Sequence, residues 1–180
     1  MLSRHAELLM HRHAAAWKPA RDALPALWIW PALTLIAGLG ALPATAAEPE
    51  QVPRIEQQVL GLVNEYRDEQ GLPRLISAPA ITEIARGHSR DMADRGAISH
   101  RGFEGRFKAL QEAVKAFRAA AENVAMNQGH ADPAEQAVSG WLGSPGHRKN
   151  IVGDYGSTGV GIVRDADGAV WITQLYVRTR

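Results

Sequence analysis

Residues 160–177 read VGIVRDADGAVWITQLYV, and this stretch decides the fold class. Two apolar runs, one ending at Val163 and one starting at Val170, flank the tetrapeptide Asp165–Gly168. Asp and Gly in such a position favour a tight turn, so the pattern predicts a β-hairpin. Helical periodicity comes before this hairpin along the chain. Helices followed by an antiparallel sheet are typical of an α+β domain with a layered core.

Apolar residues upstream of the hairpin recur at helical spacing, which predicts four helices. The fourth begins with Asp132 as its cap, Pro133 at its first position and Glu135 three residues after the cap. We extend the third helix over residues 103–118 and expect a short strand from Glu122 to Met126. The inward faces comprise Ile55, Val59, Leu62, Val63 and Tyr66; Ile81, Ile84, Ala85, His88 and Met92; Phe103, Phe107, Leu110 and Val114; and Ala137, Val138, Trp141 and Leu142.

The amino terminus reads as a secretory signal peptide over residues 1–47. A basic region is followed by an apolar run at residues 27–42 and then by an Ala-x-Ala-like end at Ala46 and Ala47, where we expect cleavage. The alternative is an uncleaved anchor, which needs about 20 apolar residues. Either Met1 or Met10 can be the true start. The expected mature protein is extracytoplasmic, periplasmic or secreted, and has no stable membrane span.

Composition excludes several classes of function. The 180 residues include no cysteine, which rules out disulfides, thiolate metal sites and a cysteine nucleophile. Residues 1–47 hold four of the 20 basic and two of the 19 acidic residues, so the remainder carries a formal charge near −1. This balance gives no indication of a nucleic-acid partner. It leaves the oligomeric state open.

Three patches of sequence, in order, resemble those of the bacterial CAP superfamily, whose SCP-like domain occurs in cysteine-rich secretory, antigen 5 and pathogenesis-related class 1 proteins. The resemblance implies an α-β-α sandwich in which helices flank a central antiparallel sheet. We assign residues 48–54 to a short linker and residues 55–180 to the CAP domain. The patches are ARGHSRDMA (85–93) with SHRG (99–102); AENVA (121–125); and WLGSPGHRKNI (141–151) with GVG (159–161) and WITQ (171–174).

The same resemblance implies a central cleft lined by two histidines and two acidic residues. Matched position by position, the histidines are His100 and His147, and one acid is Glu122. The second acid belongs near Ser144, which is not acidic in this chain. Two imidazoles and one carboxylate suit a divalent metal such as zinc with an open position. His88 lies on an apolar helix face, where a buried, hydrogen-bonded histidine is the simpler interpretation than a ligand.

We therefore expect a binding module whose cleft accepts a divalent metal or a small-molecule, lipid or cell-envelope ligand. One alternative is a metal-assisted hydrolase or peptidase, in which His100 and His147 hold the ion and Glu122 is a ligand or general base. Another is an envelope or stress-related structural protein, in which these side chains only anchor loops. These three residues are also the candidates for catalysis. Because the second acid is absent, which disfavours catalysis, we assign them first to metal binding.

Overall fold

The computed structural model describes residues 48–179. The predicted signal peptide, its cleavage site and the choice between Met1 and Met10 lie outside the described residues. Within residues 48–179, no helix is both long and apolar enough to cross a bilayer. The elements in chain order are α1 (Glu48–Glu69), β1 (Ile76–Ser77), α2 (Pro79–Arg95), α3 (Phe103–Ala113), β2 (Phe117–Asn127), α4 (Pro133–Gly143), α5 (Pro145–Ile151), β3 (Ser157–Arg164) and β4 (Val170–Thr179).

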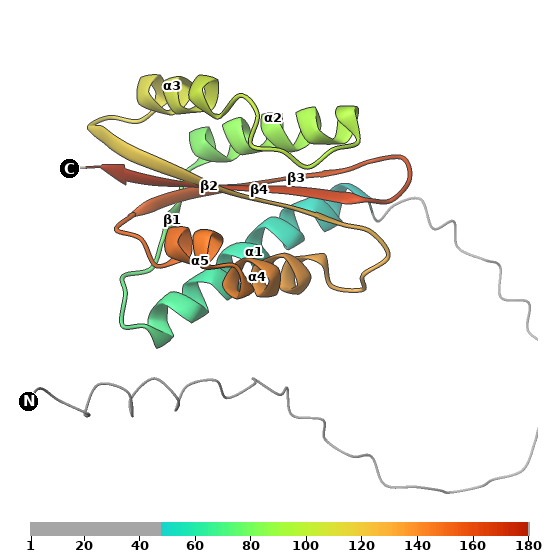
Figure 1. Cartoon of the computed structure of the whole chain (residues 1–180), viewed down its shortest axis with the longest axis horizontal. Helices are drawn as coiled ribbons and strands as arrows, with labels where there is room; N and C mark the ends of the chain where they lie inside the picture. Colours follow the sequence, from blue (N-terminus) through green and yellow to red (C-terminus); the bar gives the residue numbers. More distant parts are fainter. Residues whose placement is uncertain (1–47, 180) are drawn as a thin grey trace, which may run out of the picture. The chain divides into compact units, whose positions relative to one another are not determined.

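The domain has three layers, with one sheet between two sets of helices (Figure 1). The strand order is β1-β3-β4-β2. Pairing is antiparallel between β3 and β4 and between β2 and β4, whereas the two-residue strand β1 pairs parallel with β3. Helices α2 and α3 cover one face, and α1, α4 and α5 cover the other. The predicted α+β sandwich with a central, mainly antiparallel sheet is confirmed.

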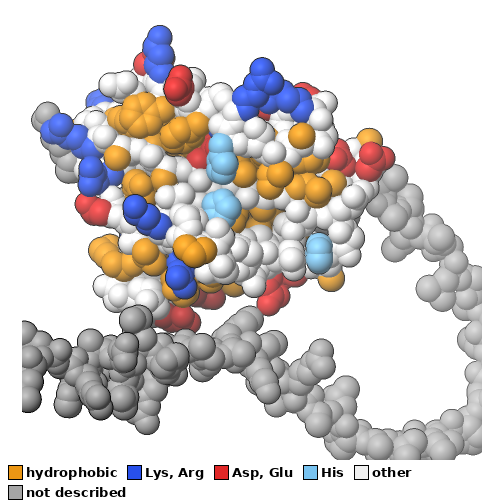
Figure 2. Space-filling model, in the orientation of Figure 1, with side chains coloured by type: hydrophobic (Ala, Val, Ile, Leu, Met, Phe, Trp, Pro, Cys, Tyr) orange, Lys and Arg blue, Asp and Glu red, His pale blue; other side chains and the backbone are white. Residues whose placement is uncertain are grey.

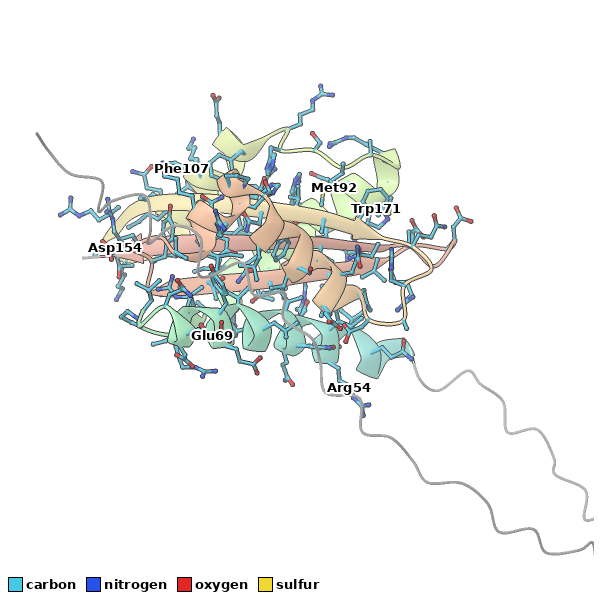
Figure 3. The ribbon with its side chains drawn as sticks, turned by 60° about the horizontal axis from the view of Figure 1, so that its bottom comes forward. Arg54, Glu69, Met92, Phe107, Asp154 and Trp171 are labelled. Atoms are coloured by element: carbon cyan, nitrogen blue, oxygen red, sulfur yellow. The ribbon has the colours of Figure 1, made fainter. Side chains whose placement is uncertain are left out.

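Apolar side chains fill both interfaces between the sheet and the helices. Val59 and Trp141 pack with Tyr176 on the α1 side, and Ile81 packs with Leu175 on the α2 side. A third cluster joins Met92 of α2 to Trp171 of β4, and the two side chains lie close together in Figure 3. Trp141, predicted on an inward helix face, is thus a packing residue, and so are Trp171 and Tyr176 of the sheet.

Local turn and cap chemistry explains why the hairpin and the fourth helix form as predicted. Asp165 closes the β3–β4 turn, because its Oδ1 accepts from the amides of Asp167 and Ala169 at 3.0 and 2.8 Å. Its Oδ2 accepts from Trp171 Nε1 at 2.7 Å. Asp132 caps α4 by accepting from the Glu135 amide at 2.9 Å.

Helix α2 lies directly on β3 because Gly159 and Gly161 have no side chains. A Cβ atom at Gly159 would overlap the backbone at residues 81–82, and one at Gly161 would overlap the backbone at residues 85–86. Ser89 uses this closeness: its hydroxyl donates to the Gly161 carbonyl at 2.8 Å. Glycine at these two positions sets the depth at which α2 packs on the sheet.

Strand β3 has a strand neighbour on its outer side only at residues 157–158, where β1 pairs with it. Farther along this edge, the Ile162 amide donates to Glu56 Oε1 of α1 at 3.3 Å. Arg86 of α2 holds the same carboxylate, with its Nε 2.7 Å from Oε1 and its Nη2 2.6 Å from Oε2. A charged pair bridging two helices therefore takes the place of a longer edge strand.

Three sequence-based boundaries need correction. Residues 48–54, assigned to a linker, form the start of α1, where Pro53 removes one backbone donor near the helix end. The third helix ends at Ala113, not at residue 118, because Ala116 takes a positive φ of 56° and reverses the chain into β2. That strand covers Phe117–Asn127 and is longer than predicted. In addition, residues 145–151 form α5, a helix that is not among the four predicted.

Candidate cleft site

The three predicted site residues come together from three different elements. His100 lies in the loop before α3, Glu122 in the middle of β2, and His147 in α5. His100 Nδ1 is 2.9 Å from Glu122 Oε1, and the ring centres of His100 and His147 are 6.1 Å apart at a tilt of 34°. Figure 2 shows histidine side chains in the middle of one face, bordered by hydrophobic side chains.

Arg106 of α3 is the site residue that sequence reasoning missed. Its Nε lies 2.6 Å from Glu122 Oε2 and its Nη2 lies 2.7 Å from Glu122 Oε1, so it grips the carboxylate with two hydrogen bonds. A signal was present: Arg106 comes three residues after Phe103 and four before Leu110, which puts a charge on the inward helical stripe. A charge at such a position usually has a buried partner.

The same guanidinium also holds the loop that carries His100. Arg106 Nη1 donates to the Arg101 carbonyl at 2.9 Å, and Nη2 reaches the His100 carbonyl at 3.4 Å. Gly102 makes the sharp entry into α3 with a positive φ of 78°. One side chain therefore contacts both the backbone of His100 and the carboxylate that its ring bonds.

The contact with Glu122 determines which nitrogen of His100 is available. Glu122 is an ionised acceptor because Arg106 holds it in a charged pair, and its side chain is only 2% exposed. His100 must then donate from Nδ1–H, which leaves Nε2 as the free acceptor on a side chain that is 52% exposed. This carboxylate–histidine arrangement is the one that orients histidine ligands of metals.

His147 is held in place through its backbone and has a neutral ring at pH 7. Burial, and then the neighbouring His100, lower the pKa of His147, which favours the unprotonated imidazole that binds metals. The buried Asn123 amide donates to the His147 carbonyl at 3.2 Å. Asn150 braces the same segment by donating to Asn123 Oδ1 at 2.9 Å.

His88 is buried in the core, and its Nε2 lies 3.9 Å from Glu122 Oε1. It is 2% exposed, and its Nε2 lies 2.7 Å from the Ser99 carbonyl oxygen. Burial, and then Arg106, lower its pKa, so its ring is neutral with the proton on Nε2. Within residues 48–179, its buried Nδ1 has no hydrogen-bond partner. The interpretation of His88 as a buried, hydrogen-bonded histidine is confirmed.

The two imidazoles are the side chains of this site that could hold a metal. Over residues 48–179, no group of three or more His, Asp or Glu side chains is arranged to hold an ion. A zinc–nitrogen bond of about 2.0 Å at the tetrahedral angle places the ring centres of two ligands on one ion about 5 Å apart. The observed 6.1 Å between His100 and His147 is wider, so the two rings would have to draw closer to share a tetrahedral ion. Glu122 then contributes by orienting His100.

A comparison of the whole sequence with protein families identifies the domain. The model of the cysteine-rich secretory protein family, CAP, matches residues 60–176. The chain belongs to the CAP family. The matched region runs from within α1 to within β4, so it includes all four cleft side chains described above.

Two Bacillus subtilis proteins are similar to the chain in sequence. The chain is 32% identical to the uncharacterized Bacillus subtilis protein YkwD over 133 residues, covering 72% of this chain and 50% of the relative. It is 40% identical to the uncharacterized B. subtilis membrane protein YlbC over 113 residues, covering 61% of this chain and 32% of the relative. The chain thus spans half or less of these relatives.

A solved structure supports the CAP fold independently. An extracellular, SCP-domain-containing protein of Bacillus anthracis superposes with a TM-score of 0.63 at 32% identity, covering 77% of this chain and 45% of that one. A cysteine-rich secretory protein of Staphylococcus aureus superposes with a TM-score of 0.58 at 19% identity, covering 71% of this chain and 39% of that one. The second likeness concerns the fold alone.

Proposed function

We propose that this CAP protein is an extracytoplasmic binding module whose cleft takes a divalent ion of the zinc type through His100 and His147. The observation that carries the proposal is the 2.9 Å contact between His100 Nδ1 and Glu122, which leaves His100 Nε2 free beside the second imidazole. Two protein ligands leave the remaining coordination positions for water or for oxygen donors of a small ligand.

Each residue around the proposed ion would contribute to binding in a different way. Glu122 accepts the Nδ1 proton of His100 and holds its ring, and Asn123 holds the backbone of His147. His147 stays neutral because burial lowers its pKa. A bound ion would supply a Lewis-acidic centre that attracts anionic or carbonyl oxygens.

The geometry supports binding better than metal-assisted hydrolysis. A general base needs a carboxylate or imidazole free to take a proton from water. Arg106 occupies both oxygens of Glu122, and one of them also accepts from His100. Glu122 is therefore a poor candidate for a general base. The other two predicted site residues, His100 and His147, are assigned to the ion.

Two observations support the proposal that the protein is exported. Residues 1–47 have the pattern of a signal peptide. The B. anthracis relative is described as extracellular. We expect mass spectrometry of the protein recovered outside the cytoplasm to give a new amino terminus near Ala46 or Ala47. An intact amino terminus on a membrane-bound product would favour the uncleaved anchor.

Zinc titration tests the metal site. The full chain, stripped of metal, is titrated by calorimetry beside a His100→Ala/His147→Ala double variant. The variant keeps His5, His11, His13 and His130, so it reports zinc taken up elsewhere. We expect one site of micromolar affinity, about −8 kcal/mol, that the variant lacks. Equal binding by both proteins would contradict the proposal and direct the search to small-molecule, lipid and envelope ligands.

A further inference from the structure

We infer that Arg106 is a positioning residue that decides what kind of ligand site the cleft can be. It keeps Glu122 out of the ligand set and commits it to orienting His100. The inference deepens the proposed function and rests on it where zinc is concerned. Its geometric part, the state of His100 without metal, is independent of zinc.

Both oxygens of the Glu122 carboxylate are already bonded within the protein. Glu122 Oε1 accepts from Arg106 Nη2 and from His100 Nδ1, and Oε2 accepts from Arg106 Nε. Turning either oxygen toward an ion would break one arm of the two-pronged contact. Because the Glu122 side chain is 2% exposed, water cannot replace the lost bond.

The side chains around the proposed ion carry no net negative charge. The guanidinium and the carboxylate form a pair whose net charge is zero, and the position near Ser144 adds no second acid. An ion in this cleft therefore meets two neutral imidazoles and no free anionic ligand. Its open positions must be filled from outside the protein, by water or by oxygen donors of a ligand.

Arg106 also holds the loop that carries His100. It bonds the carbonyl oxygens of Arg101 and His100, so its removal would release the backbone of His100 as well as Glu122. A residue that only stabilised α3 would not have these contacts with the cleft. The expected effects of losing Arg106 are thus specific to His100 and to Glu122.

The first experiment uses the metal-free full chain and ¹⁵N spectroscopy of its histidines, with His100 assigned by comparison with His100→Ala. In the wild type we expect His100 in the Nδ1–H form. In Arg106→Gln we expect a mixture of the two neutral forms. Arg101→Gln is the matched control: it removes an equal charge from the loop just before α3, where Arg101 is exposed. A wild-type His100 in the Nε2–H form would overturn the inference.

The second experiment measures zinc affinity in the same variants. We expect Arg106→Gln to bind zinc about tenfold or more tightly, because the freed Glu122 carboxylate can become a third protein ligand. Adding Glu122→Gln should abolish that gain, and Arg101→Gln should stay within about twofold of the wild type, as expected for a site that loses no ligand contact. Equal affinity in folded Arg106→Gln and Arg101→Gln would overturn the inference.

The outcomes separate the two proposals. If the wild type binds no zinc at the histidine pair, the proposed function fails, while the form of metal-free His100 still tests the role of Arg106. If Arg106→Gln does not fold, the wild-type spectrum alone decides. Arg106→Lys then adds a milder test: it keeps the charge but offers a single donor group, and its zinc affinity should lie above that of the wild type.

Discussion

Arg67 in α1 donates from Nη1 to the carbonyl oxygen of Ile151, which is 84 residues later in the chain, at 2.7 Å. The same guanidinium bonds the carbonyls of Pro73, Gly153 and Tyr155, and the residue is 1% exposed. Burial lowers the pKa of Arg67, yet an arginine stays charged in the neutral range. One buried cation thus ties α1 to the segment that follows α5.

Arg67→Met should destabilise the fold strongly, because the carbonyls of Pro73, Ile151 and Tyr155 lose the donor that Arg67 provides. The Gly153 carbonyl keeps a bond from the Tyr155 amide. Each orphaned acceptor costs about 1 kcal/mol or more, so we expect a loss of about 3 kcal/mol or more in the free energy of unfolding. Urea denaturation followed by circular dichroism measures it. Arg74→Met is the control, because its ion pair with Asp68 is exposed and should be worth less than about 1 kcal/mol. Equal losses in the two variants would show that Arg67 carries no such role.

Asp165 should make the domain sensitive to acid. The bond from Trp171 Nε1, followed by those from the Ala169 and Asp167 amides, lowers the pKa of Asp165. A lowered carboxyl pKa stabilises the fold above the unfolded value, about 3.9, and that contribution disappears as pH falls through the folded value. We expect Asp165→Asn to lower the urea midpoint at pH 7 and to approach the wild type near pH 3.

The control for that prediction is Asp167→Asn, because the Asp167 side chain makes none of the three bonds that hold the turn. The Trp171 indole N–H resonance of the wild type should move as pH falls, and it should already be shifted in Asp165→Asn at pH 7. A pH-independent difference between Asp165→Asn and the wild type would refute the linkage.

His88 should produce a second pH dependence, between about pH 7 and pH 5. Burial, and then Arg106, lower the pKa of His88, so the unfolded chain takes up a proton near pH 6.5 while the folded protein does not. Stability must therefore fall as pH falls through this window. His147 contributes in the same direction, since its pKa is also lowered.

His88→Gln removes one of these groups and should flatten the slope of the unfolding free energy against pH. Chemical denaturation at several pH values gives that slope. His130→Gln is the control, because His130 is exposed in the loop after β2. The same slope in His88→Gln and the wild type would exclude His88 as the source.

Gly161→Ala should push α2 away from β3. The new Cβ atom would overlap the backbone at residues 85–86, and overpacking typically costs about 1 to 3 kcal/mol. Gly140→Ala is the opposite case, because Gly140 lies within α4 with no atom near the added carbon. There we expect a gain of about 0.5 to 1 kcal/mol from helix propensity. Thermal unfolding of both variants checks the sign of each change.

Local chemistry explains what could be predicted from the sequence. The Asp165 turn and the Asp132 cap are each made within a few residues, so their side chains identify them directly. The third helix was extended too far because apolar residues continue in the same rhythm past Ala113. The reversal at Ala116 is a backbone event, and it leaves Phe117 packed against Phe107 at 4.8 Å between ring centres.

The candidate site followed a different logic. His100, Glu122 and His147 are far apart in the chain, so only their resemblance to a family placed them together. Arg106 escaped because its partner is 16 residues away on another element and no local spacing connects them. Its position on an inward helix face was visible, but the identity of its buried partner depends on the fold.

The edge of β3 has a further consequence for the protein in a crowded compartment. An open strand edge is a template on which a second chain can add its own strand. Here the Ile162 amide is already bonded to Glu56, and Arg86 clamps that carboxylate from the opposite helix. A second chain would have to break this ion pair before pairing could begin. The charged pair therefore opposes edge-to-edge aggregation through β3, although the fold provides only a two-residue strand to cover it.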